Sequence, residues 1–152
     1  MTAFHAGEQA LQARVGVQAQ MAQIGPRVMR DHMPDQHREF FGLLPFVVVG
    51  SMDTQGQPWA SVLAGAPGFM HAPDPTHLHI HAQPLPHDPL QRTLHEGAAL
   101  GLLGMQPHTR RRNRMNGTAH LQDGALVVEV GQSFGNCPKY IQAREPSWTP
   151  DA

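Results

Sequence analysis

The chain has little of what marks secreted, membrane or nucleic-acid-binding proteins. It has one cysteine, Cys137, so no disulfide can form within it, and we expect a protein of the reducing cytoplasm. No signal peptide is recognisable, and no apolar run approaches the ~20 residues of a membrane span. Eleven Lys and Arg against twelve Asp and Glu give a net charge of −1, whereas nucleic-acid binders are usually basic. We therefore predict no membrane and no nucleic-acid partner.

Aromatic residues are also scarce, at 6% of the chain, which leaves valine, leucine, alanine and methionine to fill the core. The length predicts one domain that buries ~70% of its unfolded surface and needs no disulfide or metal. No Ser-His-Asp order or paired-carboxylate pattern stands out. The sequence Gly-Ala-Pro-Gly at 65–68 matches neither the dinucleotide-binding nor the P-loop fingerprint. Hydrolase chemistry therefore has little support.

What the sequence does contain is a succession of strand patterns. Hairpin turns are predicted at 53–56 and at Asp123-Gly124. With no βαβ alternation, the pattern predicts a mainly β fold with peripheral helices, a six-stranded antiparallel barrel of Greek-key type. The six predicted strands cover residues 46–52, 58–64, 77–82, 98–105, 110–121 and 125–134.

Helices and loops complete the predicted organisation. Residues 1–33 form an N-terminal helical segment that Gly25-Pro26 interrupts, residues 34–144 form the barrel domain, and residues 145–152 form a disordered tail, in a single domain overall. The segment 65–75, rich in glycine and proline, is expected to be a loop. Further helices are expected at 35–44, 88–97 and 136–144.

The most distinctive segment packs four arginines into the five positions 110–114. Arginine is strongly solvated and costly to hold near a core without a partner, so we expect this strand to face an anion such as phosphate. A solvated edge strand and nucleic-acid binding are the alternatives. Because alternate side chains share a strand face, one row should hold Arg110, Arg112 and Arg114 and the other, facing solvent or a second subunit, Arg111 and Asn113.

Two other groups have chemical potential. His77, His79 and His81 share one face of a predicted strand, a geometry that can chelate a transition metal. We favour a plain polar strand face, because no carboxylate or cysteine of metal-ligand spacing flanks them, and no metal site is predicted. Cys137 precedes Pro138 at a predicted helix start, but no base for it is identifiable, so we interpret it as structural.

Four motifs, in their order along residues 29–144, resemble the pyridoxamine 5′-phosphate oxidase-like FMN-binding split-barrel family. They are LPFVVVGS from Leu44, QPWASVLAG from Gln57, TRRRNRMNG from Thr109 and FGNCPKYI from Phe134. The last two resemble a flavin-binding branch of that family. The resemblance implies a homodimer of split barrels with FMN at each of two sites between the subunits.

The resemblance also assigns roles to residues. It places the flavin ring against the backbone of the second strand, gives the ribityl phosphate to the arginine row, and brings the closing motif to the site from the partner subunit. No catalytic residue is nominated. The cofactor-binding residues it implies are Ser61, Val62, Leu63, Ala64, His81, Arg110, Arg112, Asn136 and Lys139.

The chain also departs from the oxidases that act on pyridoxamine phosphate. They carry an arginine where this chain has Ser61, and an Arg-Lys pair where it has Pro86-His87-Asp88. The C-terminal segment that closes over their substrate has no counterpart here. The resemblance therefore implies an FMN-dependent oxidoreductase for an unknown small molecule, reduced by a nicotinamide cofactor or a separate reductase. A non-catalytic flavin or haem module for binding, storage or sensing is the alternative, and a His-rich metal-binding barrel is a weaker one.

Overall fold

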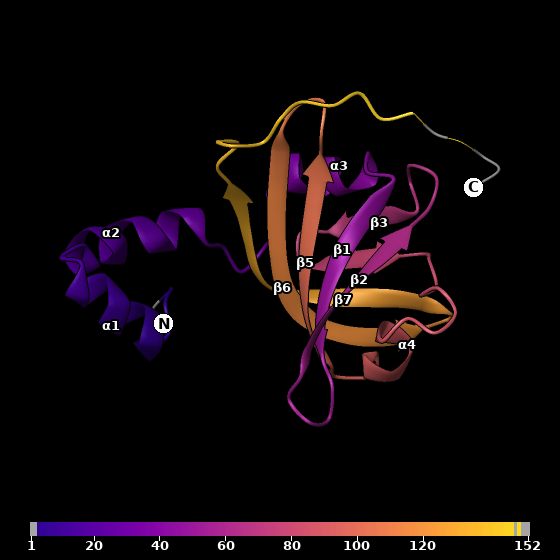
Figure 1. Ribbon diagram of the computed structural model, residues 1–152, viewed down its shortest axis with the longest axis horizontal. Coiled ribbons are helices and arrows are strands. Elements are labelled where there is room, and N and C mark those ends of the chain that lie inside the picture. The colour runs from indigo at the N-terminus through magenta and orange to yellow at the C-terminus, as the bar shows by residue number, and fades with distance from the viewer. Residues whose placement is uncertain (1–2, 148, 150–152) are drawn as a thin grey trace.

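A computed structural model describes residues 3–147 and residue 149. Figure 1 shows strands that curl around a common interior, with α3 across one end and α1 and α2 beside the barrel. None of the described helices is long and apolar enough to cross a membrane. The elements are α1 (Ala6–Arg14), α2 (Gln18–Val28), α3 (Asp35–Gly42), β1 (Phe46–Met52), β2 (Pro58–Ala64), β3 (Met70–Asp74), β4 (His77–Ile80), α4 (Leu90–Thr93), β5 (Ala99–Gln106), β6 (Arg111–Gln122) and β7 (Ala125–Asn136).

The strands form one antiparallel sheet in the order β2-β1-β5-β6-β7-β4-β3. Hairpins join most neighbours, and the pairs β1–β5 and β4–β7 need longer connections, as the Greek-key prediction requires. The mainly β antiparallel class is confirmed. The predicted number of six strands is wrong, because the sheet has seven strands within the described residues.

The additional strand is β3, which lies inside the segment expected to be a loop. It has five residues, includes Pro73, and only Met70 is fully buried. A proline is tolerated there because β3 is a terminal strand, whose outer N–H groups have no ladder to join. A short edge strand with one core residue therefore leaves almost no periodic signal.

The core lies inside the curled sheet. Alternate residues of each strand point inward, and the fully buried ones include Val47, Val49, Met70, Ile80 and Met115. Helix α3 closes one end, where Phe40 and Phe41 are fully buried and stand edge to face with centroids 5.7 Å apart.

Helix α3 sits on Gly104 of β5. A Cβ at that position would lie 2.7 Å from Leu44 Cδ1 and 2.9 Å from Phe40 Cε1, so a larger residue would force these fully buried side chains to shift. Arg111 fixes the same contact from β6: its guanidinium lies 4.8 Å from the centre of the Phe40 ring, and Nη2 donates to the carbonyl of Gln36.

Three predicted helices differ from those observed. The N-terminal interruption falls at Gly16, whose φ of +75° ends α1, and Pro26 lies inside α2. The helix expected at 88–97 shortens to α4, because Leu94 is already extended. Residues 136–144 form no helix: Asn136 ends β7, and Tyr140 has a left-handed φ of +72° in the turn that follows. Figure 1 shows this closing segment running across the top of the barrel.

Candidate functional site

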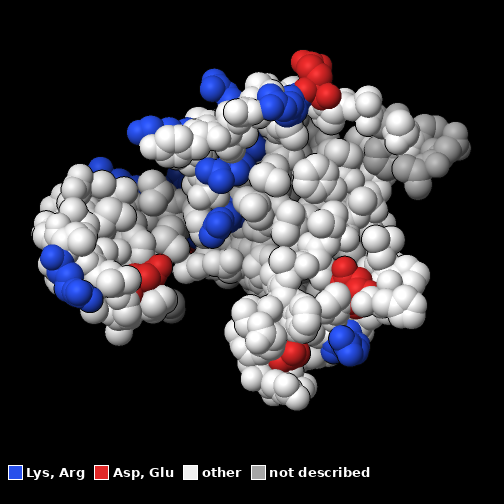
Figure 2. All heavy atoms as spheres, viewed as in Figure 1, with Lys and Arg blue, Asp and Glu red and all other residues white. Residues whose placement is uncertain are grey.

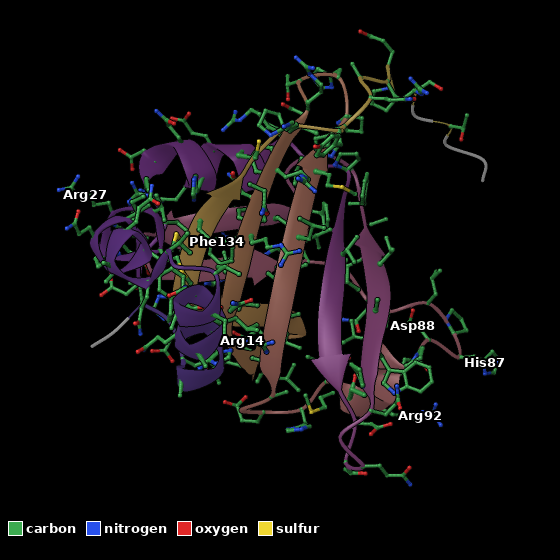
Figure 3. The ribbon with its side chains drawn as sticks, turned by 60° about the vertical axis from the view of Figure 1, so that its left-hand side comes forward. Arg14, Arg27, His87, Asp88, Arg92 and Phe134 are labelled. Carbon is green, nitrogen blue, oxygen red and sulfur yellow. The ribbon has the colours of Figure 1, made fainter. Side chains whose placement is uncertain are left out.

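One outer face of the sheet combines apolar and basic side chains. It consists of the outward residues of β2, β1, β5, β6 and β7, and we call it the outer face; Figure 3 shows these strands side by side. The strand registers align its central row across all five strands. That row is Val62, Val48, Leu103, Arg114 and Phe134.

Four of the five residues in this central row are apolar, which is unusual for a strand surface that faces water. Val62 is 46% exposed, and Val48, Leu103 and Phe134 are half-buried. The next row is nearly free of side chains, because Ala60, Gly50 and Gly101 follow one another across β2, β1 and β5. An open hollow lined by both glycines and by Trp59 and Asn116 results. The outer face therefore offers a flat, shallow surface beside charged groups.

The polar end of the outer face is built around Arg112. Arg112 lies directly across from Asn136 of β7, and its Nη2 donates to the Cys137 carbonyl at 2.7 Å. Arg112 Nε and Asn136 Oδ1 are both buried, and neither has a hydrogen-bond partner among the described residues. A buried polar atom without a partner costs free energy, and a bound ligand is one standard reason for it. Arg112 Nε is a hydrogen-bond donor and Asn136 Oδ1 is an acceptor, and they lie on facing strands, so a ligand bound between them could satisfy both.

The predicted arginine row is only partly right. Arg112 and Arg114 share the outer face, but Arg110 precedes β6 with a left-handed φ of +60°, so strand alternation does not extend to it. The opposite row also differs from the prediction. Asn113 is 5% exposed and faces the core, whereas Arg111 packs on Phe40 of α3 and stays exposed, so only the Arg111 end of this row reaches solvent. Figure 2 shows basic side chains gathered at the upper left, over the ends of β6 and β7.

The β2 residues divide between the two sides of the sheet. Ser61 and Leu63 are buried, and the Ser61 hydroxyl donates to Asp88 Oδ1 at 2.5 Å, so its side chain is held away from the outer face. Val62 and Ala64 point outward and are exposed. Because β2 is a terminal strand, one edge of its backbone has no strand partner. A ligand could therefore use the β2 backbone, but not the Ser61 hydroxyl.

The remaining predicted site residues lie apart from Arg112. Lys139 is exposed in the turn after β7, with its Nζ 5.2 Å from the centre of the Tyr140 ring. His81 follows β4, which β7 separates from β6, and its ring stacks on that of His71. The structure thus brings Arg112 and Asn136 together and leaves Arg110, Lys139 and His81 outside their contact.

Sequence reasoning missed two features of this surface. The apolar central row escaped it because Val48, Leu103 and Phe134 lie on three different strands, and only the registers align them. The contact between Ser61 and Asp88 was missed because residue 88 was expected only as the first residue of the helix 88–97. Asp88 Oδ1 accepts a hydrogen bond from Leu90 N–H, at the start of α4, at 2.8 Å, and the same oxygen accepts from the Ser61 hydroxyl.

Comparisons with known proteins agree with this architecture. Two crystal structures of HupZ from Group A Streptococcus have the same fold. A histidine-to-alanine variant is 12% identical with a TM-score of 0.52 and covers 68% of this chain and 99% of its own. The unsubstituted protein is 14% identical with a TM-score of 0.51 and covers 68% and 94%. At these identities the likeness shows the fold alone. No curated protein matches the sequence.

A sequence model of a protein family matches most of the chain. Its description is "Pyridoxamine 5'-phosphate oxidase", and the match covers residues 33–148. The matched part begins just before α3 and includes every strand of the barrel, with Arg112 and Asn136 inside it. The chain therefore belongs to the pyridoxamine 5′-phosphate oxidase-like split-barrel family.

Proposed function

We propose that this protein binds FMN on the outer face and is an FMN-dependent oxidoreductase for a small molecule other than pyridoxamine phosphate. The observation that carries the proposal is a pair of buried atoms, Arg112 Nε and Asn136 Oδ1, on facing strands in a chain of this family. Neither atom has a hydrogen-bond partner within the part of the chain that the structure describes. When bound, FMN supplies the redox chemistry, and the protein supplies binding, orientation and electrostatics.

The donor set fits the polar half of FMN. A guanidinium offers forked, permanently charged donors that suit a phosphate, and Arg114 adds a second one on the same face. Asn136 Oδ1 can accept a hydrogen bond from a ribityl hydroxyl. The free edge of β2 supplies backbone N–H and C=O groups for the ring, next to the flat row of Ala60, Gly50 and Gly101. Lys139 contributes positive charge near the closing segment.

The apolar central row supports a homodimer. Val62, Val48 and Leu103 form a continuous, partly exposed apolar band across β2, β1 and β5, and Arg114 separates this band from Phe134. Exposed apolar bands of this kind often mark a protein interface. A second copy of the chain would bury the band and enclose a cofactor held at its polar end. The site would then receive residues from both subunits.

The absorbance spectrum of the purified protein tests the cofactor. We expect oxidised-flavin bands, from co-purified or added FMN, at one flavin per chain, and a released chromophore that retains its phosphate. NADH, NADPH or a reductase should then bleach the bands, and an acceptor should restore them. A colourless protein that takes up no FMN contradicts the proposal, and a haem spectrum favours the alternative module. Bound flavin that every donor reduces only slowly indicates storage.

Replacing Val48 with glutamate tests the homodimer. Val48 lies between Val62 and Leu103 in the apolar band, so a carboxylate buried there has no cation beside it in the row, and the variant should sediment as a monomer where the original protein sediments as a dimer. Leu121→Glu is the control, because Leu121 is 50% exposed and lies at the far end of β6. A Val48→Glu protein that stays dimeric places the interface elsewhere.

A further inference from the structure

Three histidines meet on the outside of the β3–β4 hairpin, away from the outer face. Met70 pairs with Ile80 and both are fully buried, so the neighbouring pair, His71 and His79, points outward. His81 follows two residues after His79 on the same side, and its N–H continues the ladder to the Phe69 carbonyl at 2.8 Å. The core packing of this hairpin therefore fixes where the three imidazoles stand.

The three rings lie against one another. The His71 ring centre is 4.9 Å from that of His79 and 5.3 Å from that of His81, which it faces with an interplanar angle of 3°. One ring nitrogen from each histidine lies within 4.8 Å of the others. Around a tetrahedral Zn²⁺ with Zn–N bonds of about 2.0–2.1 Å, the nitrogens would stand about 3.4 Å apart. The stacked rings of His71 and His81 must turn out of their parallel arrangement to direct both lone pairs at one ion, and the exposure of these two residues permits that rotation.

The ring nitrogens of these three histidines are also uncommitted, since within residues 3–147 none makes a side-chain hydrogen bond. His77, on the same strand face, differs. Its Nδ1 lies 3.0 Å from both carboxylate oxygens of Asp74. Burial opposes the charge of Asp74, but hydrogen bonds from Thr76 N–H and His77 outweigh it and lower its pKa to about 2. Of the predicted row His77, His79 and His81, only His79 and His81 belong to the cluster, because His77 pairs with Asp74. The third histidine of the cluster is His71.

The geometry points to a transition-metal site made by His71, His79 and His81, which binds a borderline divalent ion such as Zn²⁺. Imidazole nitrogens suit Zn²⁺, Cu²⁺ and Ni²⁺ and bind Mg²⁺ or Ca²⁺ poorly. Three protein ligands leave one tetrahedral position for water or another small ligand. The described residues place no carboxylate in the cluster to orient the rings, which predicts modest affinity. The site is separate from the proposed flavin site, and neither depends on the other.

Zinc calorimetry and the visible spectrum of the Co²⁺ form test this site in the full chain without a histidine tag. We expect saturable binding of one ion per chain and the intense Co²⁺ bands of a tetrahedral site. His79→Gln should weaken Zn²⁺ binding by about 100-fold or more, since even the loss of an outer-shell partner costs about 10- to 100-fold. His71→Gln and His81→Gln should act in the same direction.

His77→Gln is the matched control. It lies on the same strand and face, but its ring already pairs with Asp74, so Zn²⁺ affinity should be unchanged. Far-ultraviolet circular dichroism shows whether each variant is folded, and the exposed positions of His71 and His81 make unfolding from those changes a poor explanation of lost binding. Absence of saturable binding, or binding that survives His79→Gln or is lost with His77→Gln, overturns the inference.

Discussion

Replacing Gly117 with alanine should lower the free energy of unfolding by about 3 kcal/mol. Gly117 lies where the β6–β7 register shifts, so that Asn116 pairs with Gln132 but Gly117 pairs with Val130. A Cβ there would stand 2.1 Å from the carbonyl oxygen of Glu129 and 2.8 Å from a methyl of Val128. Neither the carbonyl nor the buried valine can swing away, so β6 and β7 would have to separate.

Gly131 provides the control within the same bulge. It is the extra residue on β7, and a Cβ there would lie 3.5 Å from the Asn116 carbonyl oxygen, an ordinary contact. Gly131→Ala should therefore leave the melting temperature nearly unchanged, whereas Gly117→Ala should lower it by roughly 10 °C for a domain of this size. Equal melting temperatures for the two variants would show that the strands adapt to the added methyl group.

The sequence predicted the parts of the fold that local patterns control. The bounds of β1 and β2 agree with the predicted 46–52 and 58–64, because a β-branched run and a hairpin turn define both ends. Asp123 and Gly124 both have positive φ, as the predicted two-residue turn requires. The predictions for β3 and for the closing segment 136–144 were wrong because local patterns do not control these two segments. Their conformations depend on pairing with a neighbour or on a single left-handed residue, and neither leaves a periodic signal.

The candidate site was less predictable than the fold. Strand alternation predicted that Arg112 and Arg114 share one face, and the structure confirms this. The facing position of Asn136 depends on the β6–β7 register, and the bulge at Gly117 shifts that register by one residue. Counting from the hairpin turn without the bulge would pair Arg112 with the wrong β7 residue. The cluster of three histidines likewise includes His71, which lies in β3, the strand that was expected to be a loop.

Arg112→Ala should weaken FMN binding by about 1.5–3 kcal/mol, which is a factor of roughly 10 to 150 in Kd. The change removes a charged donor group whose buried Nε has no hydrogen-bond partner among residues 3–147 and 149, and it leaves Asn136 Oδ1 without the neighbouring donor. Quenching of flavin fluorescence measures the affinity directly. Arg27→Ala is the control, since Arg27 is exposed on α2, and its removal should not alter Kd.

Riboflavin separates the two roles that Arg112 has in this proposal. The guanidinium also holds the Cys137 carbonyl, so its loss could loosen the closing segment and weaken any flavin. If Arg112 binds the phosphate, Arg112→Ala lowers the affinity for FMN and leaves that for riboflavin, which has no phosphate, nearly unchanged. Arg112→Lys should recover part of the FMN affinity, because a lysine keeps the charge without the fork. An equal loss for both flavins would assign Arg112 to holding the segment and would move phosphate recognition to Arg114 or Arg110.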